Sequence, residues 1–303
     1  MGIMQKHEWE FRLKDGNCRV QAVRDNIIRC SYTKRENWEQ KSPVGIKVCP
    51  ESSFSVSEDG EKTVFRTERV VLEADSKNGG FVWRNADDGR VLLKEGRKEL
   101  TEAPLMVYST GGQEPVIKRV QTVDGERNFV QNLKAVEDHM AFHGKLNFCW
   151  QPDEHIHGLG QGEEGIYDYR GNVQYLYQHN MRIPIPFLIS DRGYGILVDC
   201  GSLMTFNDDC RGSWLYLDMI EQLDYYFIRG ENLDEIIKGF RLLTGRAVML
   251  PKWSFGYVQS KEAYKTQDEV VGIAKKYRDL DIPLDCVVQD WNTWEPGKWG
   301  NKR

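Results

Sequence analysis

The chain has 303 residues, of which 40% are hydrophobic and 29% charged, a composition typical of a globular protein with enough length for two domains. Its net charge of −5, with Lys and Arg scattered among Asp and Glu, argues against a nucleic-acid-binding protein, which would carry a basic excess or stripe. No run of eighteen apolar residues occurs, so we expect no membrane span.

The chain contains seven cysteines, which are widely spaced and include no CxxC pair. The first ten residues lack the basic and apolar regions of a signal peptide. We therefore expect reduced thiols and a cytoplasmic protein. The sequence gives no indication of an oligomeric state.

Neither a metal nor a cofactor is expected. His155 and His157 would share one face of a strand, but no Cys or carboxylate pattern completes a metal site around them. The glycine-rich segment 158–162 does not match the GxGxxG pattern of nucleotide-binding loops and opens no helix.

From the N-terminus to about residue 245, short apolar or alternating runs are separated by turn dipeptides. Such runs occupy residues 18–23, 27–32, 63–67, 70–74 and 80–84. Asp-Gly pairs stand at 15–16, 59–60, 88–89 and 124–125. Because type I′ hairpin turns need positive φ, Asp-Gly between two such runs predicts a β-hairpin. Many short strands at this spacing predict a large antiparallel β-sandwich.

One helix is predicted near the end of this region. Leu233, Ile236, Phe240 and Leu243 recur at helical spacing. Asn232 is a suitable N-cap, and Gly245 is a suitable residue for the C-terminal end.

The pattern changes after Pro251. Residues 254–260 predict a buried strand, Thr266 and Glu269 form a capping box that opens a helix, and the apolar run 284–290 predicts a second strand. Strand, helix and strand at this length form a βαβ unit, in which the two strands are parallel.

A parallel sheet needs both of its faces covered. Two parallel strands at the end of a chain cannot meet that condition by themselves. We therefore expect either that the product is truncated or that a partner completes the structure.

Asp290 closes the second apolar run and is followed by Trp291. In (β/α)8 barrels the chemistry lies at the carboxyl ends of the strands, where a carboxylate beside tryptophans suits a sugar ring. The alternative is that Asp290 caps a loop or the next helix, and spacing alone leaves both open.

At this point the sequence resembles a known family. The segments Leu250-Pro-Lys-Trp-Ser-Phe-Gly and Ile282-Pro-Leu-Asp-Cys-Val-Val-Gln-Asp are similar to the opening of the barrel in glycoside hydrolase family 31. Upstream, His157-Gly-Leu-Gly-Gln-Gly-Glu, Asp168-Tyr-Arg-Gly and Pro186-Phe-Leu-Ile-Ser resemble segments of that family's sandwich domain.

The resemblance implies a mainly β protein with two domains. Residues 1–248 would form a galactose mutarotase-like β-sandwich, and residues 249–303 would begin a (β/α)8 catalytic barrel that is incomplete. The whole enzyme would be a retaining α-glycosidase that acts most often on α-glucosides. Its partner would be an α-glycoside substrate, and neither nucleic acid nor membrane is expected.

The resemblance also implies substrate-binding residues. Asp290 matches the residue that binds sugar hydroxyls in subsite −1, and Tyr264 matches an aromatic residue lining it. Trp291 and Asn292 follow in the same loop, and Asn292 stands where maltase-type members carry a second carboxylate. Asn180 is the candidate from a sandwich loop that covers the pocket.

No catalytic residue is assigned within this chain. In the family, the nucleophile and the acid/base are both Asp residues on later barrel strands, which would lie beyond Arg303. Glu163 and Glu164 are adjacent, so on a strand they would point in opposite directions, and we interpret them as structural.

A second hypothesis is a non-catalytic carbohydrate-binding or interaction protein that retains the sandwich. The βαβ segment favours the enzyme, because a free-standing sandwich has no use for the opening of a barrel.

Overall fold

The computed structural model describes residues 3–4, 7–39, 45–46, 48–122, 125–262 and 264–290. The chain divides into two units. We call Met1–Met106 with Glu137–Arg246 the sandwich unit, and Val107–Val136 with Ala247–Arg303 the C-terminal unit.

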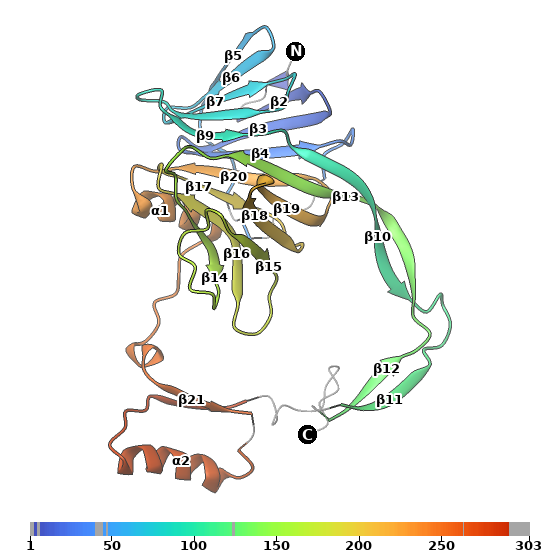
Figure 1. The fold of residues 1–303 in the computed structure, drawn as a ribbon, viewed down its shortest axis with the longest axis vertical. Helices are drawn as coiled ribbons and strands as arrows, with labels where there is room; N and C mark the ends of the chain where they lie inside the picture. Colours follow the sequence, from blue (N-terminus) through green and yellow to red (C-terminus); the bar gives the residue numbers. More distant parts are fainter. Residues whose placement is uncertain are drawn as a thin grey trace. The chain divides into compact units, whose positions relative to one another are not determined.

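Eight antiparallel strands form the first sheet of the sandwich unit, sheet A, in the order β1-β2-β3-β4-β20-β17-β16-β14 (Figure 1). These strands are β1 (Ile3–Met4), β2 (Glu8–Leu13), β3 (Gly16–Arg24), β4 (Ile27–Thr33), β20 (Leu223–Arg229), β17 (Tyr194–Val198), β16 (Ile183–Ser190) and β14 (Ile156–Gln161). Its centre joins β4 from the start of the chain to β20 from the end of the sandwich sequence, with Cys30 opposite Tyr225.

The second sheet, sheet B, has the order β15-β18-β19-β13-β9-β8-β7-β6-β5, with β10 also paired to β13. These strands are β15 (Val173–Leu176), β18 (Met204–Asp209), β19 (Gly212–Ile220), β13 (Lys134–Cys149), β9 (Val91–Glu95), β8 (Phe81–Asn85), β7 (Val70–Asp75), β6 (Lys62–Arg66), β5 (Ser55–Asp59) and β10 (Glu99–Ser109). The predicted antiparallel sandwich is confirmed.

Asp-Gly pairs mark the hairpins as predicted. Asp15-Gly16 joins β2 to β3, Asp59-Gly60 joins β5 to β6, and Asp88-Gly89 joins β8 to β9. Gly60 and Gly89 adopt φ of 61° and 71°, the left-handed region that these turns need. Between β11 (Ile117–Thr122) and β12 (Gly125–Val130), residues 123–124 lie outside the described part of the chain.

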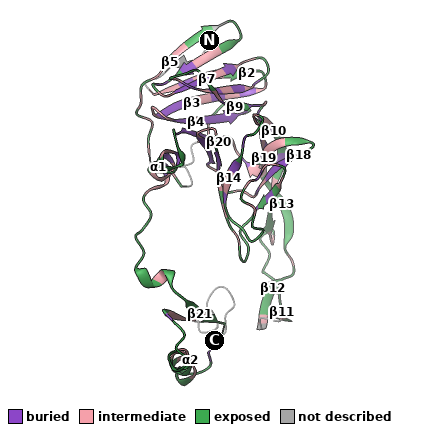
Figure 2. Ribbon diagram, turned by 60° about the vertical axis from the view of Figure 1, so that its left-hand side comes forward, coloured by how far each residue is buried: buried purple, intermediate pink, exposed green. Residues whose placement is uncertain are grey.

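Two apolar cores hold the sandwich unit together. The larger lies between the sheets and includes Trp9, Trp83, Phe206 and Phe227 (Figure 2). The smaller lies between sheet A and helix α1 (Leu233–Thr244), whose Ile236 and Leu243 are buried there.

Helix α1 begins and ends where the sequence predicts. The side chain of Asn232 accepts a hydrogen bond from Glu235 N at 3.1 Å. Gly245 follows the last turn with φ of 97° and donates to Arg241 O at 2.8 Å.

A buried ion pair lies inside the larger core. The Nζ of Lys98 is 2.8 Å from Oε2 of Glu95 on β9, and both side chains have no solvent exposure. Tyr225 on β20 donates to the same oxygen at 2.6 Å, and the indole N–H of Trp83 donates to Oε1. Lys98 also lies 3.2 Å from the ring centroid of Phe81. Glu95 therefore joins the two sheets through a charge that has several hydrogen-bond donors around it.

Burial raises the pKa of the neighbouring thiols. The pKa of Cys18 rises to about 12, and that of Cys30 also rises well above its usual range, because desolvation disfavours the thiolate. Both cysteines therefore act as core residues rather than as nucleophiles.

The C-terminal unit contains the predicted strand, helix and strand. They are β21 (Val258–Lys261), α2 (Gln267–Asp279) and β22 (Cys286–Gln289), and β21 pairs with β22 in parallel. The same unit contains the antiparallel hairpin β11–β12.

One prediction for this unit is wrong in part. A 3-10 helix, η1 (Lys252–Phe255), occupies the start of the segment predicted as a buried strand, and β21 begins only at Val258. The carbonyl of Pro251 accepts hydrogen bonds from the N–H and hydroxyl of Ser254, at 3.0 and 2.7 Å, which closes this turn. Val258 is 42% exposed, because no described element covers that face of the strand.

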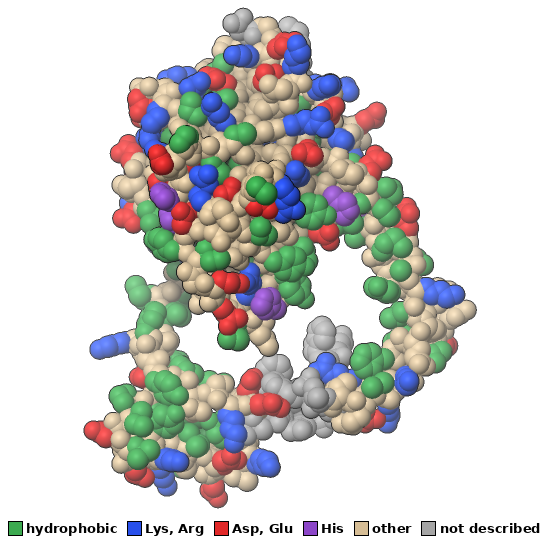
Figure 3. Space-filling model, viewed as in Figure 1, with side chains coloured by type: hydrophobic (Ala, Val, Ile, Leu, Met, Phe, Trp, Pro, Cys, Tyr) green, Lys and Arg blue, Asp and Glu red, His purple; other side chains and the backbone are tan. Residues whose placement is uncertain are grey.

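Charges of both signs are mixed on the visible face of the sandwich unit (Figure 3). On the face shown in Figure 3, basic and acidic side chains are interspersed over the sandwich unit without a basic stripe. Within the described residues, no helix combines the length and apolar character needed to cross a bilayer.

Replacing Lys98 by Met tests the buried ion pair. The change leaves the Glu95 carboxylate buried without its cation, so we expect the free energy of unfolding to fall by about 3–5 kcal/mol. Urea denaturation followed by tryptophan fluorescence measures this. Lys77→Met is the control, because its partner Glu61 lies 3.6 Å away at the surface, where such pairs contribute about 0–1 kcal/mol. Equal losses of unfolding free energy in Lys98→Met and Lys77→Met would show that the buried ion pair does not stabilise the fold more than a surface pair.

Candidate active site

The parallel strands β21 and β22 form the platform of the candidate site. Their register places Gln259 opposite Val287 and Lys261 opposite Gln289. Both strands therefore end at the same edge, where the loop to α2 and Asp290 begin.

Helix α2 covers one face of this strand pair. Tyr277 on α2 donates to Oε1 of Gln259 at 2.7 Å, and Lys261 contacts Glu269 on α2 at 2.9 Å. Because side chains alternate along a strand, Gln259, Lys261, Val287 and Gln289 share the face toward α2.

The opposite face carries the alternate residues. Val258 and Ser260 on β21 lie there and are exposed, and Cys286 and Val288 on β22 lie there half-buried. The same alternation brings Asp290 to this face, one residue beyond the strand. Its backbone N–H donates to Lys261 O at 3.3 Å, which continues the parallel ladder.

The N-cap of α2 is confirmed at Thr266, but the second hydrogen bond of the predicted capping box is not formed. The Thr266 hydroxyl accepts from Glu269 N at 3.2 Å. The Glu269 carboxylate reaches back to the N–H of Lys265 at 2.8 Å rather than to that of Thr266. The hydrogen bond from Lys265 N, followed by that from Lys261, lowers the pKa of Glu269. The hydrogen bonds of Thr266 and Glu269 together fix the start of α2 directly after the β21 loop.

Tyr264 comes to the same edge as Asp290. Its N–H donates to Oε1 of Gln289 at 2.9 Å, and its hydroxyl lies 3.4 Å from Nε2 of Gln259. The residue is only 5% exposed, and its ring lies 5.3 Å from the Lys261 amine. Tyr264 therefore lies beside residues that face α2.

Gln289 connects the loop that contains Tyr264 to strand β22, and the sequence analysis did not identify it. The only indication of this role in the sequence is a polar residue at the end of an apolar run.

Of the remaining predicted residues, the structure describes only Asn180. Trp291 and Asn292 lie outside the described residues. Asn180 is exposed in the loop between β15 and β16 of the sandwich unit.

The segment that leads to Asn180 presents a row of aromatic rings. Tyr175 and Tyr177 are 5.9 Å apart between ring centroids, and Tyr177 and His179 are 6.4 Å apart. Tyr175 and Tyr177 are each about half exposed, whereas Gln174 and Leu176, the alternate residues, are buried. Rings with exposed faces suit stacking on the apolar face of a sugar.

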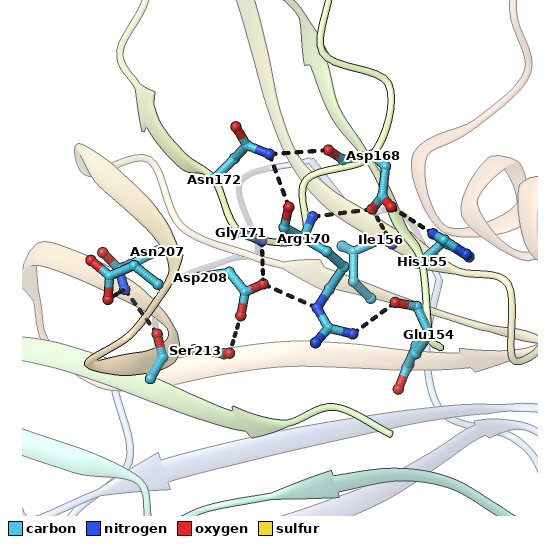
Figure 4. Close-up of polar contacts among 12 residues, drawn as sticks. Glu154, His155, Ile156, Asp168, Arg170, Gly171, Asn172, Asn207, Asp208 and Ser213 are labelled. Atoms are coloured by element: carbon cyan, nitrogen blue, oxygen red, sulfur yellow. Dashed lines mark hydrogen bonds and ion pairs between the residues drawn. The ribbon is translucent and has the colours of Figure 1, made fainter. Parts of the chain in front are cut away.

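The motif Asp168-Tyr-Arg-Gly forms a polar network rather than a catalytic group (Figure 4). Oδ1 of Asp168 accepts from the N–H groups of Ile156 and Arg170, each at 3.1 Å, and Oδ2 lies 2.5 Å from Nδ1 of His155. Burial alone would raise the pKa of Asp168, but these hydrogen bonds outweigh it and lower the pKa. The same contact with Asp168 raises the pKa of His155.

Arg170 extends the network across the sandwich. Its Nε donates to Oδ2 of Asp208 at 3.0 Å, and its NH1 donates to Glu154 O at 2.7 Å. Gly171 N donates to Oδ2 of Asp208 at 2.6 Å. The buried Glu154 carboxylate accepts from Tyr194 and Ser190 at 2.5 and 2.6 Å. These charges join strands and loops, and each has a partner.

The other groups weighed from the sequence have structural contacts. Glu164 forms an ion pair with Arg182. His157 contacts Tyr167 O at 2.7 Å, and His155 is engaged by Asp168. In the part of the chain that the structure describes, no three His, Cys, Asp or Glu side chains are placed to hold a metal ion.

Comparisons with known proteins match both regions of the chain. Residues 17–207 match the family model of the glycosyl hydrolase 31 N-terminal galactose mutarotase-like domain. Residues 247–303 match that of the glycosyl hydrolases family 31 TIM-barrel domain.

Similar proteins cover nearly the whole chain. An α-xylosidase of Saccharolobus solfataricus is 32% identical over 294 residues, which are 96% of this chain and 36% of that protein. Alpha-glucosidase 2 of Bacillus thermoamyloliquefaciens is 24% identical over 94% of this chain and 33% of its own length. The crystal structure of an α-xylosidase from Xanthomonas citri superposes with a TM-score of 0.77 at 17% identity, over 98% of this chain and 46% of that one. The chain thus spans roughly a third of the length of these two curated relatives.

The His155–Asp168 pair should make stability depend on pH. Because the pKa of His155 is raised on folding and that of Asp168 is lowered, the pair contributes fully between about pH 4 and 6.5. Its contribution falls as the pH rises through the raised pKa of His155. We expect His155→Gln to lower the Tm more at pH 6 than at pH 9. Thermal unfolding between pH 6 and pH 9, with His157→Gln as the control, tests the pair. A Tm difference between His155→Gln and the unchanged protein that did not vary with pH would contradict the role of the pair.

Proposed function

The chain belongs to glycoside hydrolase family 31, and from that premise we propose that it is the N-terminal part of a retaining α-glycosidase. Its substrates would be α-linked glycosides. α-Glucosides are the substrates expected first. α-Xylosides are a second candidate class, because the 32% identical relative is an α-xylosidase.

The observation that carries this proposal is the position of Asp290. It follows β22, a strand of the segment that matches the barrel domain, and the alternation along β22 brings it to the face opposite α2. In a (β/α)8 barrel the helices form the outer ring, so the face opposite the helix is the interior, and the carboxyl end is the active-site end.

Asp290 would bind the hydroxyls of the sugar in subsite −1. A carboxylate accepts hydrogen bonds through both oxygens, so it can hold two neighbouring hydroxyls and fix the ring for attack. Hydrogen bonds to an ionised acceptor are the stronger kind, which makes this residue suited to positioning.

The other predicted residues remain proposals with different support. Tyr264 would form the wall behind Asp290, because its backbone is tied to Gln289 at the same edge. Trp291 and Asn292 would continue the pocket from the loop after Asp290. Asn180 would meet the substrate from the sandwich loop, next to the exposed rings of Tyr177 and His179.

The chemical steps need two further carboxyl groups. A retaining glycosidase uses a nucleophile and an acid/base about 5 to 5.5 Å apart. The family places both on later strands of the barrel. This chain would therefore contribute substrate contacts and the frame of the barrel.

The alternative of a non-catalytic sandwich protein receives less support. Its discriminating feature is the βαβ unit, which a free-standing sandwich does not need. We also propose a cytoplasmic location, because all seven cysteines are free thiols in the structure.

Asp290→Asn in the complete enzyme tests the site. Loss of a charged acceptor to a sugar hydroxyl costs about 1.5–3 kcal/mol, so kcat/KM should fall by about 10- to 150-fold. Steady-state kinetics on aryl α-glucoside and α-xyloside measures this, with the exposed Asp268→Asn in the first turn of α2 as the control. Full activity of Asp290→Asn on every α-glycoside tested would show that Asp290 does not bind substrate.

The isolated chain 1–303 should not hydrolyse α-glycosides, because the resemblance assigns neither nucleophile nor acid/base to any of its residues. Assays on aryl α-glucoside, α-xyloside and α-galactoside test this, and turnover that survives repeated purification would overturn it. Limited proteolysis should cut after about residue 250 while the sandwich unit resists, since one face of β21 and β22 is uncovered.

A further inference from the structure

A pocket of about 480 Å³ lies in the sandwich unit, lined by residues of both sheets and by the turn between β19 and β20. We call it the Arg29 cavity. Arg29 on β4 alternates with Ile28 and Cys30, which belong to the core between the sheets, so Arg29 lies on the outer face. A second cavity of about 490 Å³ shares Arg29, Glu39 and Gln222 with the first. Volumes of this size are those of small-molecule sites.

The central cation of the cavity is held in place. Arg29 NH2 lies 3.0 Å from Oδ1 of Asp224, and its NH1 donates to Oε1 of Gln21 at 3.3 Å. Asp224 is only 9% exposed. Gln222 Nε2 donates a hydrogen bond to its second carboxylate oxygen, Oδ2, at 2.5 Å. The floor is therefore fixed before any ligand arrives, which reduces the entropic cost of binding.

Both donors and acceptors remain available around this floor. The amide of Gln222 has a second N–H beyond the one given to Asp224, and its oxygen accepts from Glu39 N at 2.9 Å. The Ser202 hydroxyl accepts from Met219 N at 2.9 Å and keeps its own O–H. The Glu39 carboxylate has no hydrogen-bond partner among the described residues. A hydroxyl group, which both donates and accepts, matches this set.

The charges of the lining disfavour an anionic ligand. Glu39, Asp199, Glu221 and Asp224 bring four carboxylates to it, and Arg29 is its one permanently charged cation among the described residues. His139 is engaged on both ring nitrogens, by Glu221 at 2.5 Å and by Asp138 at 2.6 Å, so it offers a ligand no further donor. Leu105, Met219 and Ile220 add an apolar part to the wall. An uncharged ligand with hydroxyls on one side and C–H groups on the other fits best.

We propose that the Arg29 cavity binds a neutral saccharide, a single sugar ring or a short oligosaccharide. The choice of a sugar among neutral polyols rests on the proposed function. Arg29 and Gln222 would donate to its hydroxyls, Glu39 would accept from them, and Met219 and Ile220 would contact its C–H face.

Isothermal titration of chain 1–303 with glucose, xylose, maltose and isomaltose tests this. We expect binding of at least one of these sugars, weakened about tenfold or more by Glu39→Gln and by Gln222→Ala, since each change removes one group that the ligand contacts. Glu163→Gln, an exposed glutamate elsewhere in the sandwich unit, is the matched control and should leave the affinity unchanged.

The same titration on Asp290→Asn separates this proposal from the preceding one. Affinity kept in Asp290→Asn but lost in Glu39→Gln and Gln222→Ala supports the Arg29 cavity, whatever the kinetics of the complete enzyme show. Absence of binding by all four sugars, or affinity unchanged in both cavity variants, would overturn it. Affinity for a cationic amine in place of the sugars would also overturn it.

Discussion

The parallel pairing of β21 with β22 is the constraint on which the functional account depends. The two strands run in the same direction, so their carboxyl ends meet at one edge. Helix α2 covers one face through Tyr277 and Glu269, and the other face carries Val258, Ser260 and Val288 without a cover among the described residues. This asymmetry distinguishes the two faces of the strand pair before any catalytic residue is considered, and the proposed role of Asp290 depends on its place on the face opposite α2.

The sandwich unit uses its charges differently. Glu95 and Lys98 are wholly buried between the sheets, and Arg170 connects Asp208 to the backbone of Glu154. In each case hydrogen bonds surround the charge, which is the condition under which a buried ion is tolerated. Such groups fix how strands meet, and their chemistry is structural even where, as with His155 and Asp168, the pairing resembles a catalytic dyad. The Arg29 cavity differs, because its lining leaves hydrogen-bonding capacity beyond what the fold itself uses.

Local signals in the sequence predicted much of this architecture. Asp-Gly pairs located hairpins, Asn232 and Thr266 located the starts of α1 and α2, and the βαβ spacing predicted the parallel pair. These predictions are correct because each depends on residues that are close together in the chain.

Features that depend on distant residues could not be predicted. Nothing in the sequence near Glu95 indicates that Tyr225 will donate to it from the other sheet. The burial of Tyr264 follows from its contacts with Gln259 and Gln289, which a motif does not reveal. The 3-10 helix at Lys252–Phe255 replaced part of a predicted strand because Pro251 and Ser254 close a turn that the apolar pattern conceals.

A crystal structure of the complete enzyme with a monosaccharide bound would test the central claim most directly. The account predicts that the carboxylate of Asp290 lies within hydrogen-bonding distance, about 2.5–3.2 Å, of one or two sugar hydroxyls, on the face of β22 opposite α2. A sugar bound in the barrel with the Asp290 side chain turned toward α2 and making no contact with it would contradict the account.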